Sequence, residues 1–192
     1  MKKTIPVLLI FLLFFSGLSG QNNYDNIVYK INGDLNGDQK ADRVIVKEDT
    51  SSRYHPYLLE IFFQDQKGNY KKVLTSTKAV MPRHPEGDAR TVTILENLEI
   101  RNGILIFSNQ LIRGNLTHKF RFQKGHFKLI GYQSVQALAG YIAYIDYNLS
   151  TGNKVTIKKA YETDKVIGEE KTTEKQSALP TLQDFSPPEV TY

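Results

Sequence analysis

Residues 33 to 44 contain the one motif in the chain whose residue types and spacing suggest a chemical role. Ca²⁺ prefers six to eight oxygen ligands at about 2.3–2.6 Å, whereas Mg²⁺ keeps several waters in a stricter octahedral geometry. Side-chain oxygens recur at positions 1, 3, 5 and 9 of this segment, and a main-chain carbonyl can act at position 7. The spacing therefore predicts one structural Ca²⁺ site. Its ligands would be Asp34, Asn36, Asp38, the carbonyl of Lys40, and Asp42.

The loop departs from an EF-hand at two positions. An EF-hand has Gly at position 6 and a bidentate Glu at position 12, and this chain has Gln39 and Ile45 there. The residues that follow Asp42 favour a strand over a helix. Missing ligands would come from water, or from Glu48 or Asp49. The alternative is an Asp/Asn/Gly turn without metal, although three carboxylates within nine residues repel one another unless a cation neutralises them.

No catalytic residue can be assigned from the sequence. HExxH, GxSxG and glycine-rich phosphate loops do not occur after residue 20. The four histidines are interpreted as surface or turn residues: His55, His84, His118 and His126. If the protein is an enzyme, its site would lie in the long surface loop predicted for residues 81 to 90, which carries Arg83, His84, Glu86 and Asp88.

The N-terminus has the pattern of a secretory signal. Two lysines precede an apolar run from Ile5 to Phe15, and Ser16 to Gly20 supplies small residues for cleavage. The apolar stretch is shorter than the roughly 20 residues that span a bilayer. We therefore predict cleavage after Ser19 or Gly20, no membrane span in the mature chain, and a periplasmic or extracellular protein.

Composition excludes several classes of protein. The chain has 192 residues and no Cys, so it has no disulfide scaffold, thiolate metal site or Cys nucleophile. Loss of Lys2 and Lys3 with the signal leaves 23 Lys and Arg against 20 Asp and Glu, a net charge of +3. This charge is small and dispersed, which argues against a nucleic-acid partner. The length supports one domain with its own core.

Alternation of period two predicts a mostly β protein. The hairpin from Thr117 to Tyr132 is the clearest case: a turn at residues 124 and 125 places Phe122 opposite Phe127 and Phe120 opposite Leu129. The same register pairs His118 with Gly131. Further strands are expected at 27–31, 44–47, 57–63, 70–74, 91–95, 103–108, 141–148, 154–161 and 165–172.

These elements predict a single antiparallel β domain over residues 21–176, preceded by a signal peptide at 1–20. It would be a sandwich or rolled sheet of about 8–10 strands. Residues 177–192 contain Pro180, Pro187 and Pro188 and predict an extended tail, which would be ordered only if it docks through Leu182 or Phe185.

Two resemblances follow from these motifs. The loop Asp34 to Asp42, its following strand, and the later turn Lys67-Gly68-Asn69-Tyr70 resemble one FG-GAP/VCBS-type calcium-binding repeat, a unit that forms blades of β-propellers. A single such unit in a chain of this length implies no full propeller. The whole chain resembles a group of exported bacterial proteins, often from Bacteroidetes, with a GDLNxDxxxD loop. That resemblance implies a compartment and a calcium loop but no activity.

Three functions remain open. The first is a non-enzymatic binding or structural module of the cell envelope or exterior, with a protein or glycan partner and one Ca²⁺. The second is an exported hydrolase with a site near residues 81–90. The third is an inhibitor or immunity-type partner of another secreted protein, which an exposed apolar patch would support. The sequence does not specify the oligomeric state.

Overall fold

The computed structural model describes residues 23–187 and consists of β-strands joined by turns and loops. The predicted signal (1–20) and the last five residues lie outside the described part. The strands are β1 (Asn26–Gly33), β2 (Asp42–Glu48), β3 (Tyr57–Gln64), β4 (Tyr70–Ser76), β5 (Ile94–Arg101), β6 (Ile104–Leu111), β7 (Gly114–Gln123), β8 (His126–Leu138), β9 (Tyr141–Asn148), β10 (Asn153–Ala160) and β11 (Val166–Thr173). Within residues 23–187, no helix is long and apolar enough to cross a membrane.

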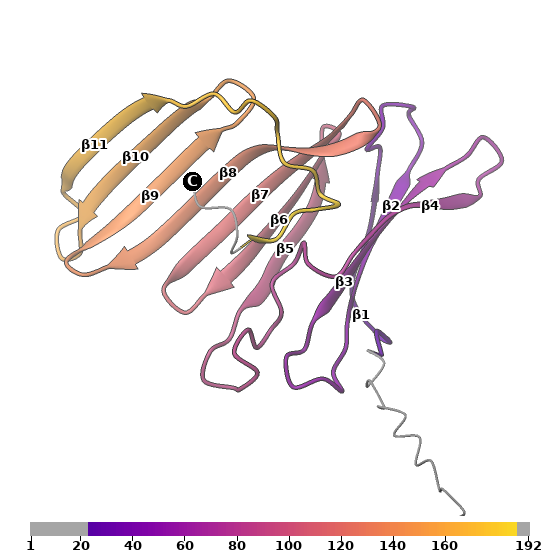
Figure 1. Cartoon of the computed structure of the whole chain (residues 1–192), viewed down its shortest axis with the longest axis horizontal. Helices are drawn as coiled ribbons and strands as arrows, with labels where there is room; N and C mark the ends of the chain where they lie inside the picture. The colour runs from indigo at the N-terminus through magenta and orange to yellow at the C-terminus, as the bar shows by residue number, and fades with distance from the viewer. Residues whose placement is uncertain (1–22, 188–192) are drawn as a thin grey trace, which may run out of the picture.

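The strands form two antiparallel sheets, which confirms the predicted mostly-β class. Strands β1 to β4 form one sheet in chain order, and β5 to β11 form a second sheet, also in chain order. Figure 1 shows the broad, curved seven-stranded sheet meeting the narrower four-stranded sheet at an angle. Eleven strands are present in the described residues, slightly more than the 8–10 expected.

The core lies between the two sheets. Strand β2 alternates strictly, with Val44 and Val46 buried. Phe107 and Phe120 from the larger sheet stack with ring centroids 5.6 Å apart. Each such side chain contributes roughly 1.5–3 kcal/mol on burial. In a chain without disulfides, this packing is the main source of stability.

One predicted strand is placed wrongly at its start. Residues 91–93 belong to the preceding loop, and β5 begins at Ile94. The reason is local bonding: the amide of Thr93 donates to the carbonyl of Arg83 at 2.8 Å, and its hydroxyl donates to the carbonyl of Pro82. Thr93 is therefore held by the loop and not by the sheet.

The β7–β8 hairpin has the predicted register next to its turn. Phe122 pairs with Phe127, and Phe120 pairs with Leu129. An irregularity between Lys119 and Phe120 then shifts the register by one residue, so His118 pairs with Tyr132 and not with Gly131. A bulge of this kind adds an unpaired residue to one strand.

His118 is buried, which corrects its interpretation as a surface residue. Its side chain is 0% exposed, and its ring lies 4.8 Å from that of Phe185 and 5.4 Å from that of Tyr132. Neither ring nitrogen has a hydrogen-bond partner among the described residues. Burial disfavours the charged imidazolium and lowers the pKa of His118 to about 3.

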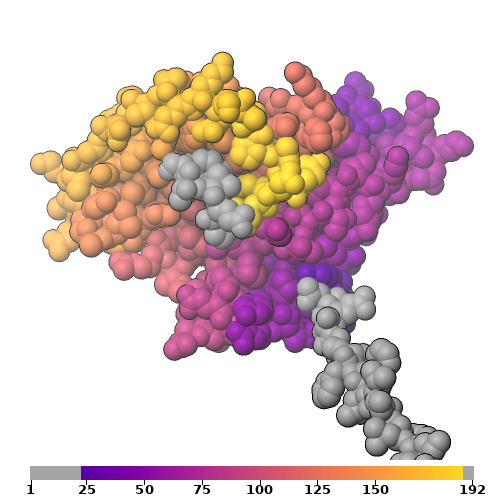
Figure 2. Space-filling view, viewed as in Figure 1, coloured from indigo at the N-terminus to yellow at the C-terminus, as the bar shows by residue number. Residues whose placement is uncertain are grey.

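The C-terminal segment completes the core. Leu182 and Phe185 are 0% and 2% exposed. The segment is anchored by two main-chain bonds of 2.9 Å to β8, from Leu129 to Pro180 and from Leu182 to Phe127. Figures 1 and 2 show it, in yellow, crossing the seven-stranded sheet toward the smaller one.

We expect His118 to make the fold sensitive to acid. The unfolded chain binds a proton at His118 as the pH falls through about 6.5, whereas the folded chain resists protonation until about pH 3. Stability should therefore fall across this window, by about 3 kcal/mol between pH 7 and pH 4. Urea unfolding at several pH values should show that His118→Leu removes this part of the acid loss. His126→Leu, at an exposed site in the same hairpin, should keep the wild-type slope.

Removal of the Phe185 side chain should show that the C-terminal segment is part of the core. Phe185→Ala should lower the free energy of unfolding by about 3–5 kcal/mol, because it removes a buried ring that packs on His118 and Phe120. Gln183→Ala, at an exposed position two residues earlier, should change it by less than about 0.5 kcal/mol. Equal effects in a denaturant titration would contradict this role.

Candidate metal centre

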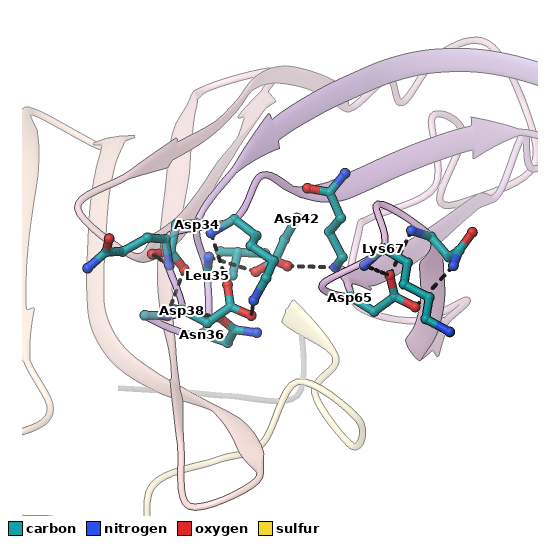
Figure 3. A network of polar contacts seen from close by, with 12 residues as sticks. Asp34, Leu35, Asn36, Asp38, Asp42, Asp65 and Lys67 are labelled. Atoms are coloured by element: carbon teal, nitrogen blue, oxygen red, sulfur yellow. Dashed lines mark hydrogen bonds and ion pairs between the residues drawn. The ribbon is translucent and has the colours of Figure 1, made fainter.

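The loop between β1 and β2 is wrapped around its own side chains (Figure 3). The two carboxylate oxygens of Asp34 accept the amides of Gly37 at 2.7 Å and Gln39 at 2.8 Å. The side-chain oxygen of Asn36 accepts the amide of Asp38 at 2.9 Å. Asp and Asn favour such local bonds in turns. The oxygens at positions 1 and 3 therefore shape the loop without any ion.

Two residues of this loop have left-handed backbone conformations. Gly37 has φ of 82°, and Gln39, at the position that is Gly in an EF-hand, has φ of 64°. The left-handed conformation costs a residue other than Gly roughly 1–2 kcal/mol of conformational free energy. The bond from the amide of Gln39 to Asp34 helps to offset that cost. The loop thus keeps the sharp bend at position 6 without a glycine there.

Gly33 is needed for a different reason. A Cβ atom at this position would lie 2.8 Å from Cγ2 of Ile100 on β5. Any side chain would therefore collide with the neighbouring strand. The glycine lets the end of β1 approach the larger sheet closely and so fixes where the loop begins.

Asp42 ties the loop to the sheet. It is 0% exposed, and its carboxylate accepts the amide of Leu35 at 2.9 Å and the amide of Gln64, at the end of β3, at 3.1 Å. Burial raises the pKa of Asp42, the two amide bonds lower it, and the negative charge of Asp38 raises it further. This carboxylate is therefore anchored on both sides and lies in a negative local field.

Asp38 is neutralised locally. Its carboxylate accepts the amide of Lys40 at 3.0 Å and contacts the Lys40 ammonium at 2.9 Å. The hydrogen bonds from Lys40 are the main reason that the pKa of Asp38 is lowered. Because the pair is exposed, the ion pair adds little to stability, and the Lys40 side chain can turn away from Asp38 at small cost.

The β3–β4 turn adds a neighbouring carboxylate that the sequence analysis missed. Asp65 accepts the amides of Asn69 at 2.9 Å and Lys67 at 2.8 Å. These bonds lower the pKa of Asp65, and the charge of Lys40 contributes to the shift. Tyr70, in the same hairpin, donates its hydroxyl to the carbonyl of Ala41 at 3.1 Å. The Asp-x-Lys-Gly-Asn turn pattern was the available sequence signal.

Glu48 and Asp49 cannot complete this site, contrary to the expectation from sequence. Glu48 is the last residue of β2 and Asp49 follows it, roughly 20 Å from Asp42 at about 3.3 Å per residue. Glu48 binds Arg83 at 2.9 Å and His55 at 3.0 Å, while Asp49 accepts the amide of Ser51 at 2.9 Å. Both carboxylates therefore bind residues at the opposite end of the smaller sheet.

The donor chemistry fits Ca²⁺, but the ligands are not gathered into a finished cage. Among residues 23–187, no three His, Asp or Glu side chains form a ready metal-binding group. Asp34, Asn36, Asp38 and Asp42 nevertheless supply only oxygen, the element Ca²⁺ prefers. A carboxylate oxygen that accepts one amide still has a lone pair for a cation. An ion would therefore have to draw these side chains together within a loop that is already bent.

The loop suggested for a hydrolase packs against a buried carboxylate. His84 lies edge-on to His55, with ring centroids 4.9 Å apart, and His55 bonds to Glu48. Glu48 is 3% exposed and also pairs with Arg83. This carboxylate has three side-chain partners, His55, Arg83 and Asn26, so the arrangement is suited to fastening the loop to β2.

The chain matches no family model, no curated protein and no solved structure. The resemblances described from the sequence therefore remain predictions.

Substitutions at Asp42 and Asp38 should separate anchoring from metal binding. In the presence of a chelator, Asp42→Ala should lower the free energy of unfolding by about 2–4 kcal/mol. The substitution leaves the amides of Leu35 and Gln64 without an acceptor near a buried site. Asp38→Ala should cost less than about 1 kcal/mol, because its bonds are exposed. Denaturant titration measures both, and similar losses would refute the anchoring role of Asp42.

Proposed function

We propose that the protein is an exported, non-enzymatic binding or structural module whose β1–β2 loop binds one Ca²⁺. The observation that carries this proposal is the anchored loop itself. Oxygen donors alternate along residues 34–38, and Asp42 joins the loop to the end of β3 through Leu35 and Gln64. An ion held by this set would connect the loop to two strands of the smaller sheet.

The role of such an ion is that of a brace. Extracellular calcium modules bind with dissociation constants of about 10⁻⁴–10⁻³ M. At roughly millimolar Ca²⁺, one site of this kind stabilises a fold by only about 0.5–1.5 kcal/mol through mass action. This is too weak for a cytosolic sensor, but it is enough to keep an exposed loop in one conformation outside the cell.

The histidines do not favour the hydrolase alternative. The cavity beside the 77–93 loop is lined by Met81, Pro85 and residues 91–93 and does not include His84. Glu48, the acidic partner of His55 and Arg83, is buried and paired. A general base needs access to a substrate proton, and this cluster instead holds the loop in place.

A thermal melt with Ca²⁺ and with chelator tests the metal proposal. For the chain from Gln21, millimolar Ca²⁺ should raise the melting temperature by about 2–5 °C over the chelated sample. Asp38→Ala should abolish this difference. Asp88→Ala is a matched control, because Asp88 also accepts the amide and side chain of a cationic residue two positions later. This variant should keep the full calcium response.

Two outcomes would reject the metal proposal. One is a melting temperature that does not change with Ca²⁺ in the wild type. The other is a calcium response that Asp38→Ala and Asp88→Ala reduce equally, which would indicate non-specific charge screening instead of a site in the β1–β2 loop.

A further inference from the structure

We propose that a groove at one end of the seven-stranded sheet binds the alkyl chain of a long-chain carboxylic acid, with Arg113 pairing the carboxylate. The groove has a volume of about 470 Å³, within the roughly 300–1,000 Å³ of small-molecule sites. Its walls come from the 77–93 loop, the β6–β7 turn and the end of β8. The main apolar side chains in these walls are Met81, Pro85, Val92, Leu111, Ile112 and Leu138.

The groove is bordered by apolar residues that the fold leaves exposed. Ile112, at the β6–β7 turn, is 65% exposed, and Leu138, at the end of β8, is 38% exposed. A single exposed apolar side chain needs no explanation. Here two of them line the same concavity, where an alkyl chain could bury them together with the loop residues.

Hydrogen bonds to main-chain carbonyls fix both walls of the groove. The amide of Ala137 donates to the carbonyl of Arg113 at 2.9 Å and joins the β6–β7 turn to β8. On the opposite wall, Thr93 is fastened to the carbonyls of Arg83 and Pro82. A preformed groove avoids much of the ordering cost of binding.

Arg113 determines the chemistry of the occupant. It is the one charged residue in the groove lining, and it is exposed. Within residues 23–187 its side chain makes one long hydrogen bond, 3.4 Å, to the hydroxyl of Tyr161, and no carboxylate there pairs with it. An uncompensated guanidinium beside an apolar groove complements a chain that ends in a single carboxylate, which Arg can bind in bidentate fashion.

The size and charge of the site disfavour larger partners. A stable protein–protein interface buries about 800 Å² on each side, and this groove is a local feature of one loop, one turn and the end of a strand. A membrane surface is recognised by several clustered basic residues, whereas this groove presents one. The occupant that matches one cation and one apolar groove of about 470 Å³ is therefore a single amphiphile.

Titration with dodecanoate and dodecanol, both kept below their aggregation concentrations, tests the proposal by calorimetry or NMR. The wild type should bind dodecanoate saturably and about tenfold more tightly than dodecanol. Shortening the acid by one CH₂ should weaken binding by up to about fourfold for each buried group. Arg113→Gln should remove the preference for the acid, and Ile112→Asp should weaken binding of both compounds at least tenfold.

Ile167→Asp provides the matched control. Ile167 is 55% exposed on β11, away from the groove lining, so this variant should bind dodecanoate like the wild type. The proposal is overturned by non-saturable uptake, by equal losses in Ile112→Asp and Ile167→Asp, or by an acid preference that survives Arg113→Gln. Repeating the titration with chelator distinguishes it from the metal proposal, because groove binding should persist without Ca²⁺.

Discussion

The fold is governed by a mismatch between its two sheets. Strands lie about 4.8 Å apart, so four strands span roughly 19 Å and seven span roughly 34 Å. The smaller sheet cannot cover the inner face of the larger one. The C-terminal segment covers part of the remainder by placing Leu182 and Phe185 over β7 and β8. The segment joins the sheet only at an isolated bridge to β8 around Thr181, and Pro180 beside it has no amide N–H with which to extend a ladder.

Polar groups that this packing buries are mostly fastened to more than one element. Asp42 joins the β1–β2 loop to β3, and Glu48 joins β2 to the 77–93 loop through Arg83. Glu60 is paired with Lys47 and Lys72 on the neighbouring strands of its sheet. These bonds stabilise the ends and edges of the small sheet. Asn109, Ser134 and His118 are exceptions among the described residues, because their buried side chains have polar atoms without a hydrogen-bond partner. Of these, His118 occupies an aromatic core position as a neutral ring.

Local patterns predicted much of the fold, whereas features set by distant contacts were missed. Alternation was sufficient for the strands and for the turn-proximal register of β7–β8. The sequence did not indicate the bulge near Lys119, which determines the residue that pairs with His118. The loop oxygens were proposed as ligands from their spacing alone, and that role stays a prediction. Glu48 and Asp49 were wrongly expected near them. An extended strand advances about 3.3 Å with each residue, so positions only six or seven residues after Asp42 lie far from it in space.

The two proposed sites lie at opposite ends of β6. The turn before this strand, at Asn102 and Gly103, lines a cavity together with Asp34 and Gly37. The turn after it carries Ile112 and Arg113. Eight residues of strand separate them by roughly 25 Å, farther than screened charges act at physiological salt. A calcium ion at one end therefore cannot serve as a ligand or charge for an amphiphile at the other. It can act on that groove only by stabilising the sheet that both share.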